Sequence, residues 1–272
     1  MASKRNIITL AILIALLMHP LVNTNNILAA ENSVQPSSME TSCITPQTEA
    51  QQAACRQVEV AILESTVRIE MSGWHLVGGH RLPLVHGGTS HATIVTGHYL
   101  VTHNHFKYAL TEPAVEDGEG YTGISLRRMD GILILEDAPL SRINIIHQEG
   151  QTMVLEIMDQ DGDNLLGELA LPTAELLDWE TIQWQAGTEL AQIDWDGENT
   201  HINWVLVESV VIDGEEPHLQ VNDFALKGAS GGGAFWNGYF LGNVWAHNVE
   251  KDPDTGEVTR LYTMIALNPF SD

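Results

Sequence analysis

The sequence is poor in positive charge. It has 12 Lys and Arg residues against 36 Asp and Glu residues, which gives a formal net charge of −24 at pH 7. A surface with so few cations repels phosphate groups. The composition therefore excludes nucleic acid and anionic membranes as expected partners, and it says little about a peptide substrate.

Cysteine is also scarce. Cys43 and Cys55 are the only two, and both precede the strand-rich part of the chain. In an oxidising compartment such a pair can close a short loop by a disulfide, and the sequence leaves open whether they are bonded or free. Neither cysteine has the partners of a zinc site, and we expect neither a metal nor a cofactor.

Long hydrophobic runs are absent after the first 30 residues. Every later apolar run is interrupted by charged residues or Gly within about ten residues, so we expect no stable membrane span in the mature protein. At the start of the chain, Lys4 and Arg5 precede an apolar run over residues 7–18, and Ala29-Ala30 follows. This order is typical of a secretory signal.

The apolar run is shorter than the roughly 20 residues that span a bilayer, which argues against an uncleaved anchor. We therefore expect residues 1–30 to be a signal peptide and the mature protein to be secreted or periplasmic. Residues 31–65 predict a polar linker followed by a short helix, because apolar residues become frequent only after Pro46.

Beyond residue 65 the texture changes to short β-branched and aromatic runs separated by Gly, Asp and Asn turns. This pattern is typical of an all-β sandwich or barrel. A charged, turn-rich interval over 159–189 separates two groups of such runs, which predicts one barrel over about 66–158 and a second over about 187–272. The predicted strands are 67–71, 91–95, 99–102, 124–128, 132–135, 153–157, 203–212 and 240–246.

The most informative stretch is Leu-Lys-Gly-Ala-Ser-Gly-Gly-Gly-Ala-Phe at 226–235. Glycines on both sides of Ser230 let the backbone turn sharply, so that two N–H groups converge on one point as an oxyanion hole. Asn237-Gly238 then predicts a hairpin between two strands. A Gly-rich turn alone is weak evidence for catalysis, and it needs a partner elsewhere in the chain.

That partner is offered by Tyr-Leu-Val-Thr-His-Asn-His-Phe at 99–106, where the predicted strand 99–102 ends three residues before His105. An imidazole at a strand end can face a nucleophile, accept its proton and return it to a leaving amine. His103 and His105 also resemble half of a metal site, but no matching His pair or carboxylate is evident.

Together the two segments resemble the trypsin-like (chymotrypsin-fold) serine peptidases, whose usual signatures are Thr-Ala-Ala-His and Gly-Asp-Ser-Gly-Gly. The resemblance covers about 67–267. It implies two six-stranded antiparallel β-barrels, here with a short N-terminal helical extension. It also implies that Ser230 is the nucleophile, His105 the general base, and Gly228 and Ser230 the backbone oxyanion donors. Ala229 replaces the family's aspartate, so the chain looks closer to Deg-type bacterial members than to trypsin itself.

The third member of the family's triad is missing from its usual place. The acid stands just before the apolar strand, here residues 153–157, and this position holds Thr152. Glu149 is close enough to substitute if the loop folds back, and we expect it in this role. Asp130 also precedes an apolar run, but Asp130-Gly131 is better interpreted as a hairpin turn. A Ser–His dyad with a polar orienting residue stays open.

Six residues before the nucleophile stands Phe224, so the resemblance implies an apolar or partly filled substrate pocket, with His247 at its border. The predicted function is that of an exported serine endopeptidase acting on proteins or peptides. The alternative is a peptidase-like binding protein that has lost catalysis. It gains weight if no acceptor lies within about 3.2 Å of the His105 ring nitrogen that faces away from Ser230.

Overall fold

The computed structural model describes residues 42–84, 89–111, 119–212 and 216–270. The predicted signal peptide and the first part of the predicted linker lie outside these residues. No helix in the described ranges is long and apolar enough to cross a membrane. Cys43 and Cys55 form a disulfide, which decides between the two states that the sequence left open.

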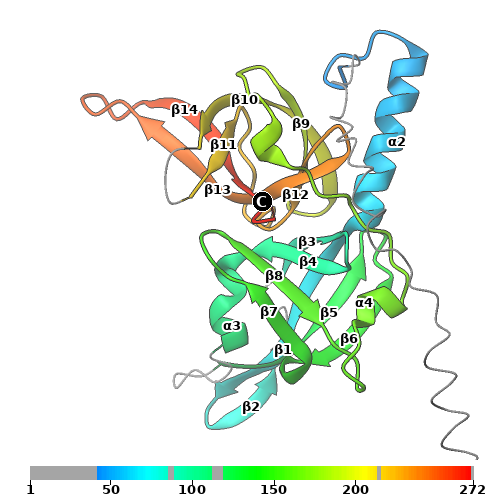
Figure 1. Cartoon of the computed structure of the whole chain (residues 1–272). Coiled ribbons are helices and arrows are strands. Elements are labelled where there is room, and N and C mark those ends of the chain that lie inside the picture. Colours follow the sequence, from blue (N-terminus) through cyan, green and yellow to red (C-terminus); the bar gives the residue numbers. More distant parts are fainter. Residues whose placement is uncertain (1–41, 85–88, 112–118, 213–215, 271–272) are drawn as a thin grey trace, which may run out of the picture. The chain divides into compact units, whose positions relative to one another are not determined.

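Most of the described chain forms antiparallel strands in two separate sheets (Figure 1). The first sheet contains β1 (Thr66–Val77), β2 (His80–Pro83), β3 (Thr89–Val95), β4 (Tyr99–His103), β5 (Glu119–Arg128), β6 (Leu133–Pro139), β7 (Ile143–His147) and β8 (Thr152–Ile157). The second contains β9 (Glu189–Trp195), β10 (Thr200–Val211), β11 (His218–Val221), β12 (Gly233–Trp236), β13 (Tyr239–Lys251) and β14 (Val258–Leu267).

The second sheet confirms the expected six-stranded barrel, because its order β10-β11-β14-β13-β12-β9 closes on itself. The first sheet corrects the expectation of a second six-stranded barrel. It has eight strands, in the order β6-β5-β1-β3-β4-β8-β7 with β2 paired to β1, and its ladder does not close. The two ends of this ladder are consecutive in the chain, separated only by the short helix η3 (Leu140–Arg142).

Pro139 lies at the end of β6, next to the gap in the first sheet. A proline has no N–H to donate to a ladder, and here it precedes the turn of η3. The chain before η3 pairs with β5, and the chain after it pairs with β8. The segment from β6 to β7 therefore bends at η3 and pairs with β5 on one side and with β8 on the other. No hydrogen-bond ladder joins β6 to β7.

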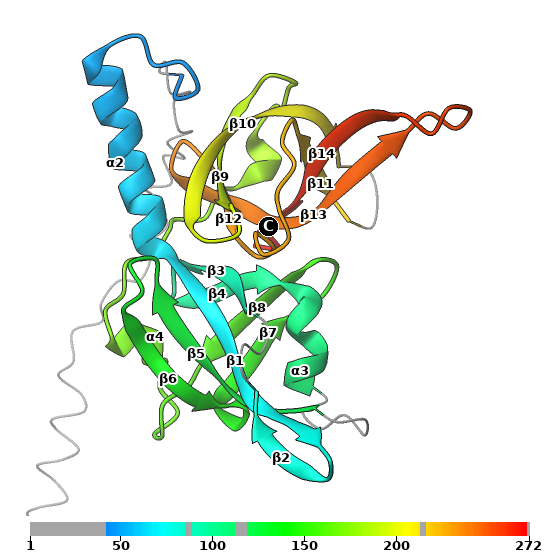
Figure 2. The ribbon, with the colours of Figure 1, turned by 180° about the vertical axis from the view of Figure 1, so that it is seen from behind.

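The helix α2 (Glu49–Ser65) confirms the predicted N-terminal helix and continues directly into β1 (Figures 1 and 2). Thr48 caps it in a reciprocal capping box with Gln51. The Trp204 indole N–H donates to Glu59 at 2.8 Å, which ties the helix to the second barrel. The remaining short helices are η2 (Asn104–Phe106), α3 (Lys107–Thr111), α4 (Leu165–Glu168) and η4 (Trp179–Thr181).

Both predicted hairpin turns are confirmed. Asn237 and Gly238 join β12 to β13 with φ of 51° and 85°, the left-handed pair that a two-residue hairpin needs. Gly131, with φ of 86°, lies in the turn between β5 and β6, where the Ile132 N–H donates to the Asp130 carboxylate at 3.1 Å. Asp130 is thus a turn residue.

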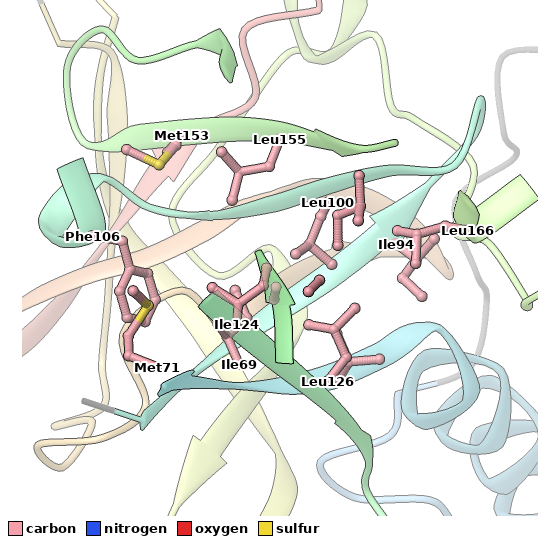
Figure 3. Close-up of a cluster of buried hydrophobic side chains, with 14 of the residues drawn as sticks. Ile69, Met71, Ile94, Leu100, Phe106, Ile124, Leu126, Met153, Leu155 and Leu166 are labelled. Atoms are coloured by element: carbon pink, nitrogen blue, oxygen red, sulfur yellow. The ribbon is translucent and has the colours of Figure 1, made fainter. Parts of the chain in front are cut away.

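The core of the first sheet consists of side chains that alternate along its strands (Figure 3). Residues on one face of a strand recur every second position, and Val67, Ile69 and Met71 of β1 follow this rule. Leu126 and Leu155 reach the same cluster from β5 and β8 and are at most 1% exposed. The barrel has its own core, which includes Leu190, Val205, Leu219, Leu241 and Ile265.

A third apolar cluster joins the first sheet to the barrel. The first sheet contributes Val95, Val101 and Val154, and the barrel contributes Ile193, Phe235 and Phe240 among others. The Phe235 and Phe240 rings meet edge to face with centroids 5.7 Å apart. Because this cluster is buried, β3, β4 and β12 are held in one arrangement.

The segment 174–177, which connects the two sheets, is hydrogen-bonded to both. Ala174 donates to Ile94 at 2.8 Å and accepts from Thr96 at 2.9 Å. Leu177 donates to Phe240 at 2.9 Å, and the Phe240 N–H donates back to Glu175 at 2.7 Å. The connection is therefore an ordered part of the interface.

Phe235→Ala is expected to lower the free energy of unfolding by about 3 to 5 kcal/mol, because it empties a closely packed site that is 1% exposed. Urea unfolding monitored by circular dichroism measures the change. The exposed residue Leu261, at 46%, offers a control, and Leu261→Ala should cost less than about 1 kcal/mol. Equal costs for the two variants would contradict a packed interface.

Candidate active site

Ser230 lies in a tight turn between β11 and β12, and the turn is held by its own backbone. Ala229 donates to Leu226 at 3.1 Å, and Gly231 donates to Val244 of β13 at 2.9 Å. Gly231 has φ of 80°, a conformation that disfavours any side chain. The glycine after the serine is therefore required by the shape of the turn.

The turn lies directly against the first sheet. The Ser230 carbonyl accepts hydrogen bonds from the His91 N–H, at 3.3 Å, and from the Ser90 hydroxyl, both on β3. A Cβ at Gly231 would overlap the His91 carbonyl and would lie 3.0 Å from the backbone N of His103. The serine turn thus packs against the strand end that carries the predicted general base.

Several polar groups of this turn have no partner. Within residues 42–84, 89–111, 119–212 and 216–270, neither the Gly228 N–H nor the Ser230 N–H donates a hydrogen bond. In the same ranges, the Ser230 hydroxyl and His105 Nε2 form no hydrogen bond either, with each other or elsewhere. Catalytic hydrogen bonds are often long in the absence of substrate, so this geometry leaves the predicted roles open.

His105 is oriented by His103, the other histidine of the motif. From the sequence, His103 was a candidate only for metal binding. Nδ1 of His105 lies 2.7 Å from Nδ1 of His103. The backbone N–H of His105 also donates to His103 Nδ1, at 3.0 Å, so that this nitrogen acts as an acceptor. His105 Nδ1 must then carry its proton, which leaves Nε2 as the basic nitrogen.

Both histidines are neutral near pH 7. Desolvation by the surrounding protein, together with the neighbouring His103, lowers the pKa of His105 from 6.5 to about 4. Burial lowers the pKa of His103 as well, and a contact with the Gln151 side chain partly opposes this effect. The pair is therefore a neutral hydrogen-bonded unit.

Glu149 is not brought to the histidine pair. It is exposed, and its carboxylate forms no hydrogen bond or ion pair with a described residue, while its carbonyl accepts from the Thr152 N–H at 3.4 Å. It lines a cavity of about 200 Å³ together with Gln151, Glu216 and Trp245. Gln151 there donates to Glu216 at 3.1 Å.

Thr152 occupies the position where the acid was sought, and it is 4% exposed. It pairs with His103 in the ladder between β4 and β8. Its hydroxyl donates to the Asn243 side chain of β13 at 2.7 Å. The position thus holds a neutral hydrogen bond between the first sheet and the barrel.

The two predicted pocket residues lie together. The Phe224 and His247 rings are 4.4 Å apart and tilted by 48°. Asp223, beside Phe224, accepts from Gln192 at 2.9 Å, so its carboxylate is already engaged.

His91, which sequence reasoning did not select, braces the turn from the other side. Its ring is 3% exposed, with Nδ1 3.0 Å from the Gly228 carbonyl and Nε2 2.7 Å from the Thr200 hydroxyl. A carbonyl only accepts, so Nδ1 donates to Gly228 and Nε2 accepts from Thr200. Burial, opposed by the bond to Gly228 and assisted by the charge of Arg68, lowers the pKa of His91 to about 4.

One group of side chains has the spacing of a metal site. The carboxylates of Asp159, Asp163 and Glu168 lie within 4.8 Å of one another, at the surface of the first sheet. The Asp159 carboxylate accepts from the backbone N–H groups of Asp161 and Asp163, both at 2.8 Å. These bonds fix the carboxylate of Asp159 within the loop.

No family model matches the chain, and no curated protein does. Among solved structures, the chain is similar to the crystal structure of Rv3671c protease in its inactive form, with 13% identity, 80% of this chain and 91% of that chain covered, and a TM-score of 0.48. It is also similar to the HtrA-type protease AlgW with a decapeptide, with 16% identity over 76% of this chain and 62% of that chain, and a TM-score of 0.48.

His91 makes stability depend on pH. Its pKa is about 4 in the folded protein and about 6.5 in an unfolded chain, so its contribution is complete above pH 6.5 and is lost as the pH falls to about 4. At 1.36 kcal/mol per pKa unit, the loss is about 3 kcal/mol. His91→Asn keeps a donor for Gly228 but cannot titrate. The free energy of unfolding is measured in urea at pH 7.5 and at pH 4. Between these two pH values, it should decrease by about 3 kcal/mol less in His91→Asn than in the wild type. Equal losses would contradict a buried neutral His91.

Proposed function

We propose that this protein is an exported serine endopeptidase that hydrolyses peptide bonds through an acyl-enzyme on Ser230. One observation carries the proposal. The turn that bears Ser230 has two N–H groups without a partner in the described chain, and it packs against the strand end that leads to a hydrogen-bonded histidine pair. Acyl transfer requires a nucleophile, a general base and oxyanion donors close to one another.

In this mechanism the Ser230 hydroxyl attacks the carbonyl carbon of the substrate, and His105 Nε2 takes its proton. The negative charge that develops on the carbonyl oxygen is stabilised by the N–H groups of Gly228 and Ser230. His105 then gives the proton to the leaving amine, which departs from the acyl-enzyme. Water attacks the acyl group in the same way, with His105 again as base, and releases the second product.

His103, rather than Glu149, is the orienting partner of His105 in this proposal. It accepts the Nδ1 proton at 2.7 Å and so keeps Nε2 free to act as base. His103 is therefore an acceptor within about 3.2 Å of the His105 ring nitrogen, the condition that favours a peptidase over a binding protein that has lost catalysis. The exposed Glu149 has no described contact to the pair.

A neutral partner stabilises the imidazolium of His105 less than a carboxylate does. The low pKa of His105 has the same origin, because its charged form is desolvated and lies beside another histidine. A base of low pKa removes a proton from serine less readily. We therefore expect slow turnover, with a base that remains unprotonated in mildly acidic solution.

The substrate side chain before the cleaved bond is proposed to be apolar and of limited size. The Phe224 and His247 rings contact each other, tilted by 48°, where the resemblance puts the floor and border of the specificity pocket. The nearby carboxylate of Asp223 is bonded to Gln192 and does not offer a free anion for a basic side chain.

Ser230→Ala should abolish labelling by a fluorophosphonate probe, because the probe reacts with an activated serine. The readout is in-gel fluorescence of the purified protein. Ser209→Ala, which removes a hydroxyl on β10 bonded to Gln220, should label like the wild type. A folded wild type that does not label would contradict the proposal and would favour the peptidase-like binding protein.

The acid limb of kcat/KM should have its midpoint near pH 4, because activity is lost only when His105 becomes protonated as the pH falls. His103→Ala removes both the orienting acceptor and an influence that lowers the pKa. It should reduce kcat on the order of 100-fold and move the acid limb to higher pH.

His103→Asn can still accept the Nδ1 proton of His105, so it should recover part of kcat. A purely structural role for His103 would lower stability without moving the acid limb. An acid limb near pH 6.5 in the wild type would contradict the assignment.

A further inference from the structure

A second cavity, of about 350 Å³, borders the serine turn on the side of β3. Its lining includes Arg68, Ser90 and His91 from the first sheet, Trp195 from β9, and Lys227 and Gly228 from the turn between β11 and β12. Gly228 belongs both to this cavity and to the predicted oxyanion hole. The cavity therefore begins two residues from Ser230 in the chain.

The charge of this cavity differs from that of the molecule. The chain has 36 acidic and 12 basic residues, yet the described lining has two cations, Arg68 and Lys227, and no carboxylate. Lys227 is exposed and forms no ion pair within the described ranges. The cavity is a local positive site on an acidic protein, and such a site concentrates anionic groups.

Arg68 is only partly neutralised. Its guanidinium lies 3.9 Å from Glu70, but the same carboxylate is held more closely by Arg127, at 3.0 Å. The guanidinium also lies over the Trp195 ring, 5.5 Å from its centroid, and this contact fixes its direction. The charge of Arg68 is felt at His91, whose pKa it helps to lower.

Apart from the Thr89 hydroxyl, which can donate or accept, the other polar groups that line the cavity are donors or are already engaged. The Trp195 indole N–H forms no hydrogen bond with any residue that the structure describes, and the indole packs against the backbone of Gly228. The Gly228 carbonyl is taken by His91, and the Ser90 hydroxyl donates to the Ser230 carbonyl. A ligand thus meets donors and positive charge, and an acceptor with negative charge fits best.

We infer that this cavity binds a carboxylate of the peptide substrate, carried within about two residues of the cleaved bond, through Arg68, Lys227 and the Trp195 N–H. The inference rests on the proposed function, because the nearness of Gly228 to the oxyanion donors is what places a substrate here. An extended peptide advances about 3.3 Å per residue, so a neighbouring residue of the substrate reaches the cavity. The carboxylate belongs either to an Asp or Glu side chain or to the C-terminus of a short peptide.

The test is a set of quenched fluorescent peptides of one sequence, with Gln or Glu at each of two positions on either side of the cleaved bond. Short peptides ending in a free acid or an amide distinguish a C-terminal carboxylate from a side chain. For the purified full chain, kcat/KM should be about tenfold higher for the best acidic peptide than for its neutral counterpart, mainly through KM. The preference should shrink between 50 mM and 500 mM salt.

Arg68→Gln and Lys227→Gln, combined, should bring the ratio of acidic to neutral peptide to about 1. Arg68→Lys keeps the positive charge and should retain part of the preference for the acidic peptide. This variant controls for a loss of folding in the double variant. Lys251→Gln removes one positive charge at the exposed end of β13 and should leave the ratio unchanged. An equal rate for acidic and neutral peptides in the wild type, or an unchanged ratio in the double variant, would overturn the inference.

Binding separates this inference from the proposed function. The Ser230→Ala chain should bind the acidic peptide about tenfold more tightly than the neutral one, as measured by fluorescence anisotropy of labelled peptides. Absence of cleavage with such selective binding overturns the peptidase and keeps the carboxylate site. Cleavage without selectivity in either assay overturns the carboxylate site and keeps the peptidase.

Discussion

The site depends on one backbone contact between two sheets. The Ser230 carbonyl is held by strand β3, through the N–H of His91 and the hydroxyl of Ser90. A carbonyl fixed in this way also fixes the peptide plane that follows it, and Gly231 can approach because it has no side chain. The apolar cluster beneath, with Phe235 and Phe240, prevents the sheets from sliding and so preserves the contact.

The second feature of the site is that its histidines are neutral near pH 7. His91, His103 and His105 all have lowered pKa values because each is desolvated, and the first position of β8 holds Thr152, which is hydrogen-bonded to Asn243. A neutral residue at this position avoids the cost of desolvating a charge there. In the proposed mechanism, the lack of a carboxylate at this position weakens His105 as a general base, while the three histidines stay neutral over a wide range of pH.

The sequence predicted those parts of the fold that depend on local chemistry. Asn237-Gly238 required a hairpin, and the apolar positions after Pro46 predicted α2. The opening of the first sheet could not be predicted, because it depends on which neighbours the chain meets on either side of Pro139. Strands such as β2, with its four residues all exposed, carry no apolar alternation that would reveal them.

For the site, the sequence identified His105, Ser230 and their glycines as candidates, but the partner of His105 was out of its reach. The spacing of His103 and His105 suggested metal binding, whereas the turn of η2 brings their two Nδ1 atoms within hydrogen-bond distance. Glu149 has the charge and the place in the chain that the missing acid requires, but neither property determines which way its side chain points. His91 gave no signal because a single buried histidine has no pattern.

The connecting segment 174–177 has a consequence for the behaviour of the molecule as a whole. It lies beside Ile94 of β3 and beside Phe240 of β13, where each strand has a neighbour on one side and the connection on the other. A bare stretch of strand backbone invites pairing with another chain. By covering both stretches, the few residues that connect the two sheets also keep these two pieces of strand backbone from pairing with another chain.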